Sequence, residues 1–129
     1  DLRIFAVQPA NCGPIAAAWA GEPRTPPVPT IAEGTAIAEP IRLPEILAAL
    51  RASGGGALAI PESEIESATF DLARMGAYVE PTSAQAAAAI PRLLARGAIR
   101  PGETTVLVLT GSGLKATQRI ADAMGLPLG

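Results

Sequence analysis

The chain contains no histidine, one cysteine, Cys12, and one lysine, Lys115. Without histidine there is no imidazole for a catalytic triad. A single cysteine excludes an internal disulfide and leaves too few soft ligands for a zinc site. We therefore expect no bound metal and a reducing compartment, the cytoplasm. Aromatic residues make up only 3% of the chain, so the core must consist of aliphatic side chains and alanine.

Charge and hydropathy exclude two classes of partner. The formal net charge is -2 and the basic residues do not cluster, so the sequence lacks the positive field that nucleic-acid binding requires. No apolar run approaches the ~20 residues of a membrane span. The 129 residues, 49% of them hydrophobic, suit one modest folded domain that binds neither nucleic acid nor membrane.

Strands and helices alternate along the sequence, which predicts an α/β protein with a largely parallel sheet. Apolar runs predict strands at residues 2–8, 57–60 and, most strongly, 105–109. Apolar periodicity predicts helices at residues 14–20, 44–52, 63–75, 84–96 and 116–124. Ligands of parallel sheets bind beyond the carboxyl ends of the strands, so the turns at 8–13 and 110–113 are the predicted ligand sites.

Several side chains are predicted to have purely structural roles around the third and fourth helices. Thr82 and Ser83 have the hydroxyl groups of helix caps, so we expect one of them to cap the fourth helix. Pro91 is expected to kink or break that helix. Glu62, Glu64 and Glu66 are expected on a solvated face of the third helix.

The segment TVLVLTGSGLK, residues 105–115, carries the most information about function. Thr110 follows the predicted buried strand, and Gly111 and Gly113 allow a ligand and the backbone to approach closely. An ordinary turn between strand and helix fits this pattern, and so does an anion site at a helix N-terminus. A P-loop does not fit, because its G-x-x-x-x-G-K-[ST] spacing is missing, and a dinucleotide fingerprint would need a third glycine.

Three segments taken in order carry a family resemblance: TIAEGTAI (residues 30–37), GAYVEPTSA (residues 76–84) and LTGSGLK (residues 109–115). They resemble threonine synthases and their close relatives, which are pyridoxal-phosphate enzymes related to tryptophan synthase β-subunits and serine/threonine dehydratases. The resemblance extends over nearly the whole chain. It implies part of the large domain of a fold-type-II enzyme, a three-layer α/β structure whose largely parallel sheet is flanked by helices.

The resemblance also implies contacts with pyridoxal 5'-phosphate. Thr110 would hydrogen-bond the pyridine nitrogen of the cofactor, while Gly111 and Gly113 would keep the turn close to the ring. Glu80 would lie near the ring, although it fits equally well as a residue that pairs with backbone donors before a helix. A hydroxyl does not hold the ring nitrogen protonated as a carboxylate would, which tempers the ring as an electron sink.

No catalytic residue is expected in this chain. In the family, the Schiff-base lysine and the glycine-rich loop that holds the cofactor phosphate precede the matching region, and Lys115 does not correspond to that lysine. We interpret residues 1–129 as the C-terminal part of a catalytic domain, a fragment that is inactive alone. Its expected partners are the N-terminal part of the same enzyme, an amino-acid substrate and a further copy in a homo-oligomer.

The leading functional interpretation is a lyase of threonine biosynthesis, a threonine synthase that converts O-phosphohomoserine to threonine and phosphate. One alternative is another elimination or replacement enzyme of the same fold, such as a serine/threonine dehydratase. The other alternative is a non-catalytic binding domain that retains the fold.

Overall fold

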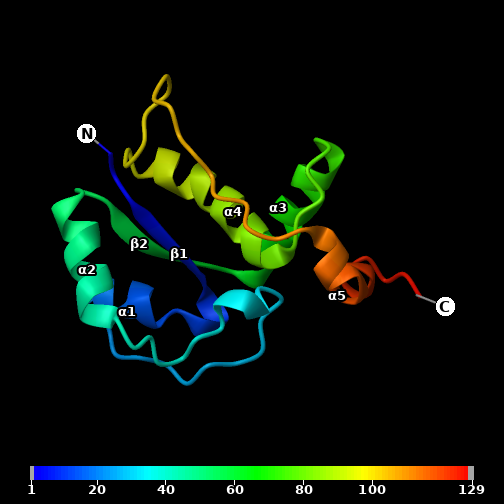
Figure 1. Ribbon diagram of the computed structural model, residues 1–129, viewed down its shortest axis with the longest axis horizontal. Coiled ribbons are helices and arrows are strands. Elements are labelled where there is room, and N and C mark those ends of the chain that lie inside the picture. The colour runs from blue at the N-terminus through cyan, green and yellow to red at the C-terminus, as the bar shows by residue number, and fades with distance from the viewer. Residues whose placement is uncertain (1, 128–129) are drawn as a thin grey trace.

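The computed structural model describes residues 2–127 and confirms the α/β class with a small parallel sheet (Figure 1). Strand β1, Phe5–Pro9, pairs in parallel with strand β2, Gly56–Ile60, and Val7 lies opposite Leu58. Parallel strands need a long crossover connection, and the chain between β1 and β2 supplies it with two α-helices and two short 3-10 helices.

Five α-helices lie within the described residues: α1 (Pro14–Ala20), α2 (Leu43–Ala52), α3 (Glu62–Arg74), α4 (Pro81–Ala95) and α5 (Thr117–Ala123). Three short 3-10 helices are η1 (Ala10–Cys12), η2 (Glu33–Thr35) and η3 (Gly113–Ala116). The first two predicted helices are confirmed to within one residue. Among the helices described, none combines the length and the apolar character that crossing a membrane requires.

The apolar core lies between β2 and the helix pair α3–α4. In Figure 1, α1 and α2 lie on one side of the two strands, and α3 and α4 lie on the other. The core residues are aliphatic or alanine, as predicted: Ala32, Leu58, Ile60, Ile65, Ala88, Ala89, Leu93 and Ile99. Since alanines fill much of α4, this helix can approach the sheet closely.

Helix α4 runs unbroken for 15 residues, so the predicted break at Pro91 is wrong. A proline inside a helix removes one hydrogen bond and crowds the preceding turn, at a cost of about 3 kcal/mol. Pro91 itself is exposed, but Ala89 before it and Leu93 after it are buried in the core. Packing on both sides of the proline therefore holds the helix together.

The predicted capping role of Thr82 and Ser83 is also wrong. The helix begins at Pro81, so Glu80 is its N-cap, and no side chain caps it. Proline favours the first helical position because its missing N–H would have no partner there in any case. Thr82 and Ser83 therefore lie inside the first turn, and their hydroxyl groups are available for contacts with other segments.

The strongest strand prediction, residues 105–109, is not confirmed. The segment crosses α4 as an unpaired stretch of chain, drawn in orange in Figure 1. Val106 and Val108 are 79% and 71% exposed, whereas Leu107 lines the groove between α3 and α4. Strand propensity takes effect only where a neighbouring strand supplies hydrogen bonds, and the described sheet contains only β1 and β2.

The acidic residues at the start of α3 do not form the predicted solvated face. Glu62 accepts hydrogen bonds from the Thr30 hydroxyl at 2.8 Å and from the Ile31 amide at 2.7 Å. Arg92 of α4 donates two hydrogen bonds to Glu64, at 2.7 and 2.6 Å. Glu62 thus fixes the loop before η2 to α3, and Glu64 joins α3 to α4.

Removing the charge of Glu64 should have a small, pH-dependent effect. The hydrogen bonds from Arg92 hold the pKa of Glu64 below its usual value of 4.5. A carboxyl whose pKa is lowered by folding stabilises the protein above its unfolded pKa, and this stabilisation is lost as the pH falls through the folded pKa. Because solvent screens the half-exposed pair, we expect Glu64→Gln to lower the free energy of unfolding by at most about 1 kcal/mol at neutral pH.

Urea unfolding of the wild type and of Glu64→Gln at a series of pH values measures this effect. The difference between the two should shrink as the pH falls below 4.5. Asp71→Asn is the matched control, because the pair of Asp71 with Arg74 is more exposed and its loss should change little. A Glu64→Gln difference that keeps its size in acid would contradict the account.

Candidate functional site

The first turn of α4 joins segments that are far apart in the sequence. Glu80 and Ser83 contact the turn at residues 110–113, and Thr82 and Gln85 contact η2. Figure 1 shows the N-terminal end of α4, η2, α5 and the carboxyl ends of both strands toward the same end of the molecule. This is the end of a parallel sheet at which ligands bind.

Ser83 is at the centre of the contact with the 110–113 turn. Its side chain is only 2% exposed. Ser83 Oγ accepts a hydrogen bond from the Gly111 amide at 2.8 Å and lies 3.3 Å from Thr110 Oγ1. The Gly111 carbonyl in turn accepts a hydrogen bond from the Glu80 amide at 3.1 Å. Gly111 is therefore held through both its N–H and its C=O.

A short antiparallel contact extends this junction. Val79 and Ser112 form an isolated β-bridge, and the Gly113 amide donates to the Tyr78 carbonyl at 3.0 Å. The segment that leads into α4 and the turn that leads into η3 thus run side by side in opposite directions. Backbone hydrogen bonds fix the position of the turn without help from a strand before it.

Both glycines of the turn are required by side chains of this chain. A Cβ atom on Gly111 would lie 1.8 Å from Glu80 Oε1, and one on Gly113 would lie 2.8 Å from the Tyr78 ring. The Glu80 carboxylate and the Tyr78 ring therefore fill the space that a larger residue would need. Intramolecular packing alone accounts for both glycines.

The opposite side of the first turn of α4 holds η2. Thr82 Oγ1 accepts a hydrogen bond from the Gly34 amide at 3.0 Å. Gln85 Nε2 donates to Thr35 Oγ1, also at 3.0 Å, and Gln85 is 4% exposed. The three segments that carry the family resemblance therefore meet at one turn of one helix.

The four residues predicted to contact a cofactor, Glu80, Thr110, Gly111 and Gly113, lie together in this junction. Thr110 is exposed, Glu80 is half-buried, and both glycines are buried. Since Thr110 is an exposed residue, its side chain can reach a bound molecule, which is what its predicted role requires. Their contact with a cofactor stays a prediction.

Sequence reasoning missed the contribution of Ser83. A hydroxyl residue at the start of a helix usually caps that helix, and this expectation hid the contact with Gly111. Pro81 is the sequence feature that could have revealed this contact, because proline favours the first position of a helix. It places Ser83 two residues inside the helix, where its side chain is free to bind another segment.

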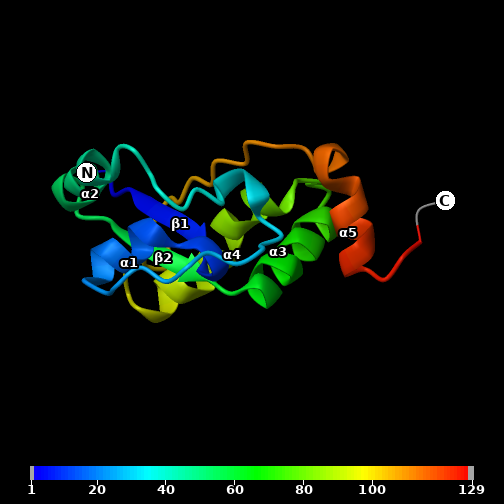
Figure 2. The same cartoon turned by 90° about the horizontal axis from the view of Figure 1, so that it is seen from below.

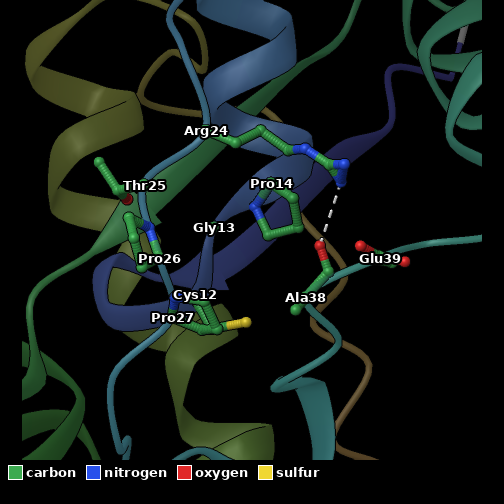
Figure 3. A pocket seen from close by; sticks show the side chains of 9 residues that line it. All are labelled: Cys12, Gly13, Pro14, Arg24, Thr25, Pro26, Pro27, Ala38 and Glu39. Carbon is green, nitrogen blue, oxygen red and sulfur yellow. Dashed lines mark hydrogen bonds between the residues drawn. The ribbon is translucent and has the colours of Figure 1, made fainter.

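The other predicted ligand turn, at residues 8–13, borders a hollow of about 250 Å³ (Figure 3). The hollow is lined by Cys12, Gly13, Pro14, Arg24, Thr25, Pro26, Pro27, Ala38 and Glu39. Arg24 donates to the Ala38 carbonyl at 3.3 Å along one side, and Cys12 is 4% exposed. One thiol, two opposite charges and a wall of prolines do not define a reaction.

Segment η2 and the turn at residues 110–113 both contact the first turn of α4, at the end of the molecule where the parallel strands end. The turn carries an exposed threonine, Thr110, followed by two glycines within three residues. These features are typical of α/β proteins that bind a small organic ligand or cofactor. Residues 1–111 match the family of pyridoxal-phosphate dependent enzymes, and the chain belongs to this family. The predicted cofactor class is thereby confirmed for the family.

Several threonine synthases are similar to the chain. That of Methanosarcina acetivorans is 38% identical over 99 residues, which cover 76% of this chain and 24% of that protein. That of Methanocaldococcus jannaschii is 42% identical over 87 residues, covering 67% and 22%, respectively. That of Mycobacterium bovis is 34% identical over 114 residues, covering 88% and 31%. The chain thus spans less than a third of the length of these relatives, and the predicted resemblance is confirmed.

Alanine substitutions at the two glycines should distinguish their neighbours, Glu80 and Tyr78, by how readily each side chain can move. Glu80 can swing away from a new methyl group, so we expect Gly111→Ala to lower the free energy of unfolding by about 1 kcal/mol. The Tyr78 side chain has fewer rotatable bonds than that of Glu80, and three of its ring atoms lie 2.8 Å from the position of the new methyl group, so Gly113→Ala should cost about 3 kcal/mol. Denaturant unfolding measures both, and adding Glu80→Ala should rescue Gly111→Ala but not Gly113→Ala. Equal rescue of both variants would contradict the packing described here.

Proposed function

We propose that residues 1–129 form the C-terminal part of the catalytic domain of a pyridoxal-phosphate-dependent threonine synthase. The complete enzyme would convert O-phosphohomoserine and water to threonine and phosphate. Membership of the family and the similarity to threonine synthases support this proposal. The observation that carries it is the junction at the first turn of α4, where Thr110 and Glu80 lie together beside an exposed surface.

In this proposal, Thr110 binds the pyridine nitrogen of the cofactor. Pyridoxal phosphate supplies an electron sink that delocalises the negative charge left when the substrate loses its α-proton. A hydroxyl makes a neutral hydrogen bond to the ring nitrogen, whereas a carboxylate would hold a proton on it. Thr110 would therefore make the cofactor ring a weaker electron sink than a carboxylate would, which suits elimination and replacement at the β and γ carbons of an amino acid.

The other residues of the junction would position Thr110. Ser83 and the Glu80 amide hold Gly111 from both sides, so the residue before it has a fixed backbone. The Glu80 carboxylate lies against Gly111 and would add negative charge near the edge of the ring. Gly111 and Gly113 keep the turn narrow enough for these neighbours.

The remaining groups would come from the N-terminal part of the same enzyme. That part would supply the lysine that holds the cofactor covalently and the loop that binds its phosphate, as the family resemblance implies. We propose that it also supplies a strand beside residues 105–109, which would complete a larger sheet flanked by helices on both faces. The exposed Val106 and Val108, which flank Leu107, support this proposal, because a solvated surface does not favour exposed valines at alternate positions of a β-rich run.

The direction of residues 104–110 fits that of a strand in the proposed larger sheet. Residues 104–110 run toward the same end of the molecule as β1 in both views (Figures 1 and 2). Arg3, just before β1, donates a hydrogen bond to the Ala98 carbonyl and pairs with Glu103. The beginnings of β1 and of the unpaired segment are thereby tied to each other, as two strands of one parallel sheet would need.

The proposed activity is tested with the complete enzyme that contains this sequence. We expect threonine and phosphate to form in equal amounts from O-phosphohomoserine, and we expect this chain alone to be inactive. Thr110→Val should lower kcat/KM by about tenfold, the effect of one lost hydrogen bond. Thr104→Val is the matched control, because Thr104 is exposed in the same segment but lies outside the junction. Dehydration of serine or threonine without reaction of O-phosphohomoserine would contradict the proposal.

A further inference from the structure

We propose that the hollow shown in Figure 3 binds a small free amino acid through both of its charged groups. The hollow lies beside the turn that follows β1, so it is separate from the junction at the first turn of α4, and it does not depend on the proposed function. Pockets for drug-sized ligands measure about 300–1,000 Å³. A hollow of about 250 Å³ therefore suits a smaller molecule.

One wall of the hollow is fixed in place by hydrogen bonds. This wall is formed by residues 22–29, an exposed stretch that contains four prolines. The Val28 amide donates to the Asn11 carbonyl at 3.0 Å, and Asn11 Nδ2 donates to the Pro29 carbonyl at 2.6 Å. Proline also fixes its own φ angle, so the stretch has little conformational freedom left. A ligand would therefore meet a preformed surface, which favours binding.

Two opposite charges border the hollow without neutralising each other. Arg24 donates to the Ala38 carbonyl at 3.3 Å, and Glu39 is the next residue, so both charges lie beside Ala38 (Figure 3). Within residues 2–127, neither Arg24 nor Glu39 takes part in an ion pair. A guanidinium has several N–H donors, and Ala38 takes only one of them. Both charged groups are therefore available to a ligand.

An amino acid carries the complementary charges a few atoms apart. Its carboxylate can accept two parallel hydrogen bonds from Arg24, and its ammonium group can donate to Glu39. The N-terminus of α1 does not compete for the carboxylate, because Gln8 Oε1 already accepts the Ile15 and Ala16 amides at 2.8 and 3.3 Å. A simple anion would be repelled by Glu39, and a simple cation by Arg24. The two charges together therefore favour a zwitterion.

The rest of the lining determines which side chain the ligand can have. Pro14, Pro26 and Pro27 present apolar surface, and the Cys12 thiol behaves as a small apolar group. An acidic or basic side chain would find no further charged partner among the residues that line the hollow. The ligand class is therefore a small aliphatic α-amino acid.

A purely structural role for Arg24 has different consequences. If Arg24 only ties the proline-rich wall to Ala38, its loss weakens one exposed contact and no amino acid binds in the hollow. If the hollow is a binding site, the loss of Arg24 removes the partner of the ligand carboxylate. The affinity for an amino acid therefore separates the two roles.

The experiment uses the complete, cofactor-loaded enzyme, with L-valine as the probe. Saturation-transfer NMR gives the Kd of valine, and the absorption spectrum of the cofactor reports any valine that reaches the cofactor. We expect a Kd on the order of 1 mM and an unchanged spectrum. Isobutylamine lacks the carboxylate of valine, and isovalerate lacks its ammonium group. Each should bind at least about tenfold more weakly, because one charge-assisted contact is missing.

Charge-removing variants locate the bound valine. Arg24→Gln and Glu39→Gln should each raise its Kd by about tenfold or more. Both residues are exposed, so we expect both variants to fold. Arg42→Gln and Glu45→Gln are the matched controls, because they remove the same charges from an exposed ion pair at the start of α2. Neither control should change the Kd.

Three results would overturn the proposal. The first is valine that does not bind, or that binds equally well to the wild type and to both variants of the hollow. The second is isovalerate that binds as tightly as valine, which would make the hollow a site for anions. The third is a changed cofactor spectrum together with a Kd that Arg24→Gln leaves unchanged, which would place valine at the cofactor. None of these results measures the conversion of O-phosphohomoserine, so the proposed function is tested separately.

Discussion

The buried hydroxyl of Ser83 is the contact on which the candidate site depends. It binds the amide of Gly111 at 2.8 Å, and the backbone of Glu80 binds the carbonyl of the same glycine. Together they fix a turn that follows an unpaired stretch of chain. In most α/β proteins a strand positions the turn that follows it. Here the helix on the other side of the junction does so, and Thr110 is held in place even though residues 105–109 are unpaired.

The same turn of α4 also holds η2, through Thr82 and Gln85. Arg119 of α5 forms an ion pair with Glu33 of η2, which links the element after the Thr110 turn to the same loop. The loop, the helix and the turn are therefore joined in a closed set of contacts. Such a set allows a site to keep its geometry while the sheet beside it is only two strands wide.

Sequence patterns correctly predicted those elements whose formation depends on interactions between residues close in the sequence. Proline, glycine and apolar periodicity act over a few residues, and they located both strands, α1 and α2. The family resemblance placed Glu80 and Thr110 in one site, and the structure brings them together. The partner of Ser83 could not be predicted, since it lies 28 positions away in the sequence. The strand at 105–109 failed for the opposite reason: its local propensity is high, but the hydrogen-bonding partner it needs is not among the described residues.

Amide hydrogen exchange at Gly111 tests the central claim most directly. The account predicts slow exchange at Gly111, because its N–H is buried and bonded to Ser83, beside fast exchange at the unpaired amides of residues 105–109. The protection should disappear in Ser83→Ala while the exchange of β1 and β2 stays unchanged. Exchange at Gly111 as fast as in the preceding residues would show that α4 does not hold the turn, and would contradict the account.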